Sequence, residues 1–218
     1  CASKSPAEAE DREVRLTRDE VVKYAPRFSP DGAWIAYAVS SGAESGALGV
    51  FVISSKGGQS RRISPDSISA YPLGWTSEGA VYCRSMDGQT IYTIGLDGSM
   101  KSREAGDPFS RISAVSPDGR TTLLLKFNQD NRDLGRVKEG GDFEFVSPTP
   151  AWEEEAVLGP TADDVTVVST PSYLSQSTTI SVWSDKSRSY TALPLPEGPK
   201  WQTGWSDDGQ RMAYSFRR

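Results

Sequence analysis

The chain has 218 residues, of which 36% are hydrophobic, and its 24 Lys and Arg against 29 Asp and Glu give a formal net charge of −5. This negative balance argues against a nucleic acid partner, and no run of 18 apolar residues is present to span a bilayer as a helix. Histidine is absent, which excludes Ser-His-Asp triads, Cys-His pairs and histidine-ligated metal sites. The 20 Gly, 14 Pro and many short alternating apolar runs predict an all-β protein.

Residues 1–12 begin with Cys1 and continue with small, polar and charged residues, a composition typical of a flexible tether. This start resembles that of a mature bacterial lipoprotein, whose first cysteine carries diacylglycerol and an acyl chain. The resemblance implies a lipid at Cys1 and an anchored position on the periplasmic face of a bacterial membrane. A proteolytic fragment that happens to begin at cysteine is the alternative. Cys83, in the alternating run "AVYCRS", is interpreted as a buried free thiol, although a Cys1–Cys83 disulfide would compete with acylation.

A turn motif recurs along the chain. Its copies are "FSPDG", "WTSEG", "VSPDG" and "WSDDG", whose acidic residues stand at positions 31, 78, 118 and 208, at spacings of 47, 40 and 90. A degenerate copy around Asp163 divides the last interval into two steps of 45. Five copies at a period of about 44 residues indicate the blades of a β-propeller.

The motif has a local structural explanation. Proline presets φ at the first turn position, the acidic side chain bonds the nearby backbone, and glycine takes a positive φ. The residues assigned this structural role are Pro30, Asp31, Gly32, Glu78, Gly79, Pro117, Asp118, Gly119, Asp208 and Gly209. The aromatic residue before each turn, Phe28, Trp75 or Trp205, is expected on an inner strand where blades pack face to face.

Each repeat contains four strand-like runs, so residues 13–218 are predicted to form one propeller domain of four-stranded antiparallel blades. The blades are expected near residues 24–64, 70–105, 110–147 and 151–195. A fifth blade combines residues 199–218 with a closing strand at 13–17, which would hide two exposed sheet edges. An open or truncated six-bladed ring is the alternative.

The stretches "FSPDGAWIAYAV" at 28–39 and "GVFVISSKGGQSRRIS" at 49–64 resemble the repeat of the TolB-type propeller family. The second and third copies match this pattern in part, and the fourth has lost the turn motif. The resemblance implies a propeller fold and envelope proteins as partners. It leaves function open, because this repeat occurs in binding proteins and also beside catalytic domains.

The sequence therefore predicts a lipid-anchored, non-catalytic propeller that acts as an interaction module or accessory subunit of a bacterial membrane-associated complex. No catalytic residue, metal site or cofactor other than the lipid is assigned. The alternatives are a small-ligand-binding propeller and a glycan hydrolase with paired carboxylates. Its candidate residues are Glu153, Glu154, Glu155, Asp163 and Asp164, although "WEEEAV" is interpreted as a solvated strand edge or loop. Calcium at clustered aspartates is a further alternative, and the polar loops at 40–48, 128–135 and 171–177 carry no recognition motif.

Overall fold

The computed structural model describes residues 16–40, 47–105, 109–127, 131–146, 149–159, 164–172, 175, 177–205 and 212–216, with only the backbone described for 201–204 and 213–216. Cys1 and the predicted tether at 1–12 lie outside these residues, as do Asp163, Asp208 and Gly209. The described residues form strands, turns and connections without a helix, and hence without a helical membrane span.

Four sheets contain four antiparallel strands each, and every strand pairs with the next one along the chain. Blade 1 consists of β1 (Lys23–Phe28), β2 (Trp34–Ser40), β3 (Leu48–Ser54) and β4 (Arg61–Arg62). Blade 2 consists of β5 (Ala70–Trp75), β6 (Val81–Ser85), β7 (Thr90–Ile94) and β8 (Met100–Glu104). Blade 3 consists of β9 (Ser110–Val115), β10 (Thr121–Phe127), β11 (Arg132–Lys138) and β12 (Phe143–Phe145). Blade 4 consists of β13 (Trp152–Leu158), β14 (Asp164–Thr170), β15 (Thr179–Ser184) and β16 (Ser189–Ala192).

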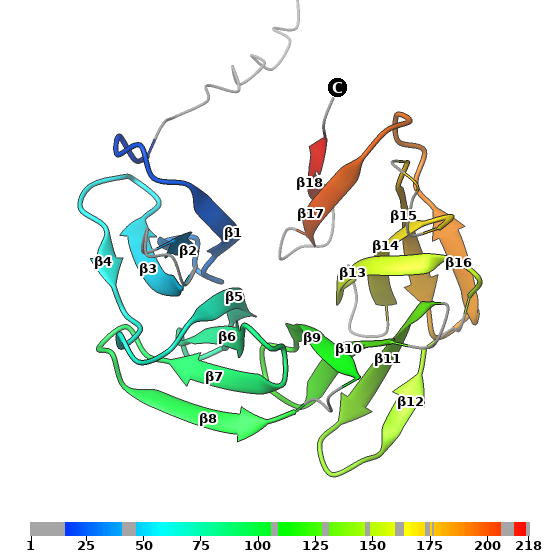
Figure 1. Ribbon diagram of the computed structural model, residues 1–218, viewed down its shortest axis with the longest axis horizontal. Helices are drawn as coiled ribbons and strands as arrows, with labels where there is room; N and C mark the ends of the chain where they lie inside the picture. The colour runs from blue at the N-terminus through cyan, green and yellow to red at the C-terminus, as the bar shows by residue number, and fades with distance from the viewer. Residues whose placement is uncertain are drawn as a thin grey trace, which may run out of the picture.

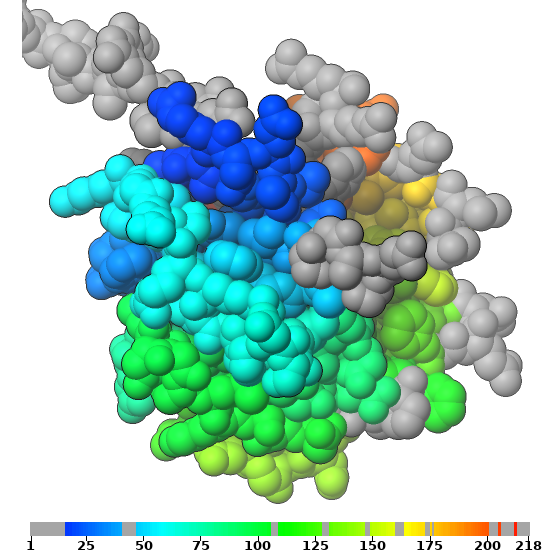
Figure 2. All heavy atoms as spheres, turned by 60° about the vertical axis from the view of Figure 1, so that its left-hand side comes forward, coloured from blue at the N-terminus to red at the C-terminus, as the bar shows by residue number. Residues whose placement is uncertain are grey.

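A fifth, two-stranded sheet pairs β17 (Lys200–Trp205) with β18 (Met212–Phe216). Figure 1 shows the blades in an arc around a common axis, with the first strand of each blade nearest the axis and β1 and β17 at the two ends. The space-filling view in Figure 2 shows the first blades, coloured from dark blue through cyan to green, packed against one another in chain order. The architecture is a β-propeller with four complete four-stranded blades.

The Ser-Pro-Asp-Gly turns are held by their own side chains. In the first copy the Ser29 hydroxyl donates to Asp31 Oδ1 at 2.6 Å, and the amide of Ala33 donates to the same oxygen at 3.0 Å. These donors hold the pKa of Asp31 below its usual range. Gly32 has a φ of 67°, a left-handed conformation that favours glycine.

The third copy repeats this arrangement, but the second reaches the same turn by another route. Ser116 donates to Asp118 Oδ1 at 2.6 Å, and Gly119 has a φ of 75°. In the second copy the Thr76 hydroxyl accepts the amides of Glu78 and Ala80, each at 3.1 Å. In this copy a hydroxyl oxygen accepts the backbone amide that the carboxylate accepts in the other two copies.

The hydrophobic core consists of clusters between successive blades. One cluster joins blades 1 and 2 around Val52 and Trp75, a second joins blades 2 and 3 around Ile91 and Ile112, and a third joins blades 3 and 4 around Leu125. The prediction for Cys83 is confirmed, because this thiol is free and fully buried in the first cluster, where burial raises its pKa.

The expectation of inter-blade packing is correct for Trp75, which is 5% exposed, but wrong for Phe28, which is 67% exposed. Trp75 packs against blade 1, whereas Phe28 ends β1 at the first end of the arc (Figure 1). Leu16 packs against a second apolar cluster of blade 1, which consists of Ile35, Tyr37 and Ile53. We call it the outer cluster.

The predicted closing strand is not formed by its described residues. Leu16 and Thr17 belong to no strand, and residues 13–15 lie outside the described part of the chain. Leu16 instead packs on the outer cluster of blade 1, where contact with apolar side chains removes part of its surface from water. Closure of a five-bladed ring is therefore not observed.

Candidate functional site

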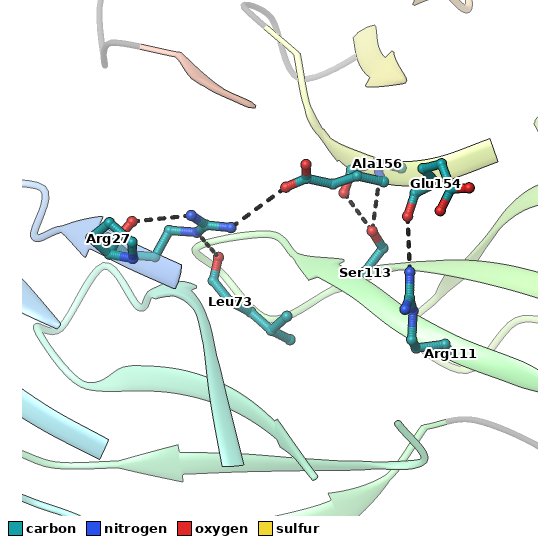
Figure 3. Close-up of polar contacts among 8 residues, drawn as sticks. Arg27, Leu73, Arg111, Ser113, Glu154 and Ala156 are labelled. Atoms are coloured by element: carbon teal, nitrogen blue, oxygen red, sulfur yellow. Dashed lines mark hydrogen bonds and ion pairs between the residues drawn. The ribbon is translucent and has the colours of Figure 1, made fainter. Parts of the chain in front are cut away.

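Polar side chains connect the inner strands around the axis of the arc, as Figure 3 shows. Arg27 on β1 donates from Nε to the carbonyl oxygen of Leu73 on β5 at 3.1 Å. Its Nη2 lies 3.8 Å from Glu155 Oε1 on β13, and both side chains are about four-fifths buried. Burial lowers the pKa of Arg27, and the charge of Glu155 opposes that shift. One guanidinium thus connects blades 1, 2 and 4.

Blades 3 and 4 are connected in the same way. Arg111 on β9 donates from Nη2 to the carbonyl oxygen of Glu154 at 2.8 Å. The Ser113 hydroxyl donates to the carbonyl oxygen of Ala156 at 2.7 Å and accepts the amide of Ala156 at 2.9 Å. We call these contacts, together with those of Arg27, the axial network (Figure 3).

The three glutamates of β13 correct the interpretation of "WEEEAV" as a solvated edge or loop. This segment is an inner strand, and Glu153 is only 1% exposed. Thr149 donates to Glu153 Oε1 at 2.7 Å, while Oε2 accepts no hydrogen bond from the described residues. Burial raises the pKa of Glu153 to about 7, with a further contribution from Asp133 that Arg132 opposes.

Three arginines gather where the inner strands begin. This arginine cluster consists of Arg84 at the end of β6, Arg111 at the start of β9 and Arg132 at the start of β11. The Arg84 guanidinium lies 4.7 Å from the ring centroid of Tyr71, an arrangement that favours a cation–π contact. Burial, followed by the neighbouring charge of Arg111, lowers the pKa of Arg84 to about 10.

Arg132 is held between aromatic rings and a carboxylate. Its guanidinium lies 4.9 Å from the ring centroid of Phe127 and 4.7 Å from that of Trp152. Its Nη1 lies 3.2 Å from Glu154 Oε2. Residues 128–135 were expected to be a polar loop, but β11 extends back to Arg132, which is buried.

The apolar side chains beside the cluster remain exposed. Phe109, next to the start of β9, is 67% exposed, and Met86, in the turn after β6, is 48% exposed. Phe127 is 40% exposed. We call the arginine cluster together with Tyr71, Met86, Phe109, Phe127 and Trp152 the arginine–aromatic surface.

The turn residues assigned from the sequence lie at the other end of the inner strands. The described turns around Asp31, Glu78 and Asp118 follow the last residues of β1, β5 and β9, whereas the arginine–aromatic surface surrounds the first residues of β9 and β13. The turns and the candidate site therefore occupy opposite faces of the propeller.

The carboxylates considered for a hydrolase are not brought together in the described residues. Glu153 pairs with Ser169 near one end of the β13–β14 hairpin, and Asp164 begins β14 at the other end. Glu154 and Glu155 each lie beside an arginine. Within the described ranges, no group of three or more acidic or cysteine side chains is arranged to hold a metal ion.

Sequence reasoning missed the arginines that form the axial network and the arginine cluster. Together these are four residues, Arg27, Arg84, Arg111 and Arg132. They share no motif and lie on different strands, so no spacing connects them. A signal was present in "RFSPDG" and "SRISAVSPDG", where Arg27 and Arg111 interrupt apolar inner strands just before a turn motif. A charge at such a position indicates a polar partner on a neighbouring blade.

Replacing Arg27 with alanine is expected to lower the free energy of unfolding by about 2 kcal/mol, because the change removes a donor to Leu73 and the cation beside Glu155. Arg120→Ala is the control, since Arg120 and Glu139 form an exposed pair on the turn face, and it should cost less than about 0.5 kcal/mol. Urea denaturation of the two variants and the wild type measures the difference. Equal losses would contradict the bridging role.

The buried carboxyl of Glu153 predicts a pH dependence of stability. Its pKa is about 7 in the folded protein and returns to about 4.5 on unfolding, so the folded state binds more protons between these values. The free energy of unfolding should therefore fall as pH rises from about 4.5 to about 7, by on the order of 2 kcal/mol. Glu153→Gln should remove this slope in denaturation curves measured across that range. Identical slopes for variant and wild type would contradict the assignment.

Comparison with known proteins supports the fold. No protein-family model matches the chain. The uncharacterized protein Atu1656 of Agrobacterium fabrum is 27% identical over 147 residues, which are 65% of this chain and 49% of that protein. The chain thus spans about half the length of the curated relative that it matches.

Solved structures with the same architecture include two TolB proteins. TolB from Acinetobacter baumannii matches with a TM-score of 0.61 and 22% identity over 81% of this chain and 44% of that one. A protein from Agrobacterium tumefaciens assigned as TolB matches with a TM-score of 0.63 and 17% identity over 93% of both chains. Oligogalacturonate lyase from Vibrio parahaemolyticus matches with a TM-score of 0.55 and 10% identity over 91% of this chain and 73% of that one. The chain therefore has the β-propeller fold that TolB-like proteins share with some enzymes.

Proposed function

We propose that this chain is a non-catalytic propeller that binds another protein through the arginine–aromatic surface. The observation that carries the proposal is the composition of this surface. Arginine, tryptophan and tyrosine are the residues enriched at the energetic centres of protein interfaces, and exposed phenylalanine and methionine lie beside them here. A surface of this kind gains apolar burial and directional hydrogen bonds when a partner covers it.

The carboxylates of β13 support binding over catalysis. A glycosidase needs two carboxyl groups that contact the substrate from opposite sides. Glu153 is too deeply buried to contact a ligand, and Glu154 and Glu155 lie beside Arg132 and Arg27. Because these side chains serve packing and blade connection, we do not propose the hydrolase.

We further propose that the protein works as an accessory or stabilising subunit of a membrane-associated complex, at the periplasmic face of a bacterial membrane. The TolB-like fold supports this location. A lipid on Cys1 would hold the propeller near membrane or envelope proteins, and a tether such as residues 1–12 would let its faces turn towards them.

Site-specific photo-crosslinking tests the binding surface. A benzoylphenylalanine placed at position 109 of the full chain, in the native cell, should form crosslinks to a discrete partner that mass spectrometry identifies. Position 28 is the matched control, because Phe28 is also 67% exposed but ends β1 on the turn face. Equal crosslinking from both positions, or none from position 109, would contradict the proposal.

The lipid anchor has a separate test. The mass of the N-terminal peptide from membrane-purified protein should exceed that of the free peptide by one diacylglycerol plus one acyl chain. Cys1→Ser should move the protein from the membrane fraction to the soluble fraction, because a polar tether alone has little membrane affinity. Cys83→Ser is the control. An unmodified Cys1 peptide would refute the anchor and leave the propeller's binding surface to be judged by crosslinking.

A further inference from the structure

The arginine cluster contains two cations that no carboxylate of the described residues pairs with. Several arginines elsewhere lie beside acidic groups, as Arg136 does beside Glu144 and Asp185. Arg84 and Arg111 form no ion pair with any part of the chain that the structure describes. Among the described residues, each guanidinium donates to one backbone carbonyl oxygen, at 3.5 Å for Arg84 and 2.8 Å for Arg111.

The chain holds these two arginines near each other. Arg84 lies one residue before the end of β6, and in the β6–β7 turn that follows, the Gly88 carbonyl accepts the amide of Ile112 at 3.0 Å. The fit is tight, since a Cβ on Gly88 would lie 2.8 Å from Cγ of Arg111. The turn is thereby fixed against the first residues of β9, and the two arginines lie on adjacent blades.

Each guanidinium is also fixed at its tip. Arg84 lies over the ring of Tyr71, and Arg111 donates to the Glu154 carbonyl at 2.8 Å. A guanidinium carries five N–H donors, so most of those on this pair have no acceptor among the described residues. Both side chains are half-buried and retain access to solvent. Two fixed cations with unused donors attract an anion.

We propose that Arg84 and Arg111 bind a carboxylate of an acidic peptide segment in the partner protein, an inference that rests on the proposed function. The planar guanidinium matches a carboxylate in a bidentate arrangement. Glu154, whose backbone carbonyl accepts from Arg111, has its carboxylate on Arg132. No carboxylate of the described residues neutralises the pair, and a carboxylate of the partner would relieve the repulsion between two like charges.

Apolar neighbours favour a peptide over a small anion. Met86 follows Arg84 by two residues and Phe109 precedes Arg111 by two, and they are 48% and 67% exposed. An acidic segment that also carries an apolar side chain can cover them while its carboxylates reach the arginines. A phosphate or a lipid headgroup would satisfy the charges and leave the apolar side chains in water.

The test uses two fluorescein-labelled, end-capped hexapeptides, "DELFDE" and its neutral counterpart "NQLFNQ", titrated with the full chain and followed by fluorescence anisotropy at low salt. The wild type should bind the acidic peptide at least about tenfold more tightly than the neutral one, because charge-assisted hydrogen bonds are formed only with the former. Arg84→Gln combined with Arg111→Gln should abolish this preference.

A charge-matched control separates the site from general electrostatics. Arg120→Gln combined with Arg188→Gln removes two arginines from turns on the opposite face, after β9 and β15, and should keep the tenfold preference. Arg84→Lys combined with Arg111→Lys retains both charges but loses the forked geometry of the guanidinium. This variant should keep only part of the preference for the acidic peptide. Thermal unfolding of each variant shows whether the fold is retained.

Three results would overturn the inference. Equal binding of the two peptides by the wild type would do so, as would unchanged binding by the double glutamine variant. Binding to phosphatidylglycerol vesicles that depends on Arg84 and Arg111, without a peptide preference, would assign the site to a lipid headgroup instead. If position 109 still crosslinks to its partner in the double glutamine variant, the interaction surface stands and only the role of the two arginines fails.

Discussion

The inner strand of every blade has one backbone edge that no strand of its own sheet pairs with, and the arrangement of the propeller depends on how these edges are satisfied. Each complete sheet ends at its axial strand, β1, β5, β9 or β13. Unpaired edges near the axis would lose hydrogen bonds to water as the blades pack. Side chains from neighbouring blades supply the missing partners, so the arc is held by polar contacts near the axis and by apolar clusters between the blades.

The same solution explains why arginine occurs in these strands. A long side chain with several donors reaches a carbonyl on the next blade, as Arg27 does to Leu73 and Arg111 does to Glu154. Tryptophan does this in the reverse direction, since Nε1 of Trp75 donates to the carbonyl of Arg27 at 2.9 Å. Arg111 has a second place in the structure, because it lies at the start of β9 and so also belongs to the arginine–aromatic surface.

Local features of the fold could be predicted from the sequence, because their causes lie within a few residues. The turns at Asp31 and Asp118 depend on a hydroxyl, a carboxylate and a glycine that are adjacent in the chain. The inward-facing charges could not be predicted in the same way. Whether Glu153 is solvated or buried depends on Thr149, Asp133 and Arg132, which only the packed blades bring together. Phe28 shows the converse, since its apolar character predicts burial and its place at the end of the arc leaves it exposed.

The ion pair between Arg27 and Glu155 joins the first blade to the fourth, and this predicts an order of assembly. The turns and hairpins of each blade close short loops, which form early, and the clusters between successive blades need only neighbouring repeats. Arg27 reaches Glu155 only when the two intervening blades have already set the curvature of the arc. The Arg27–Glu155 ion pair is therefore expected to form late in folding. It is expected to break early in unfolding, when either of the two blades between its partners opens.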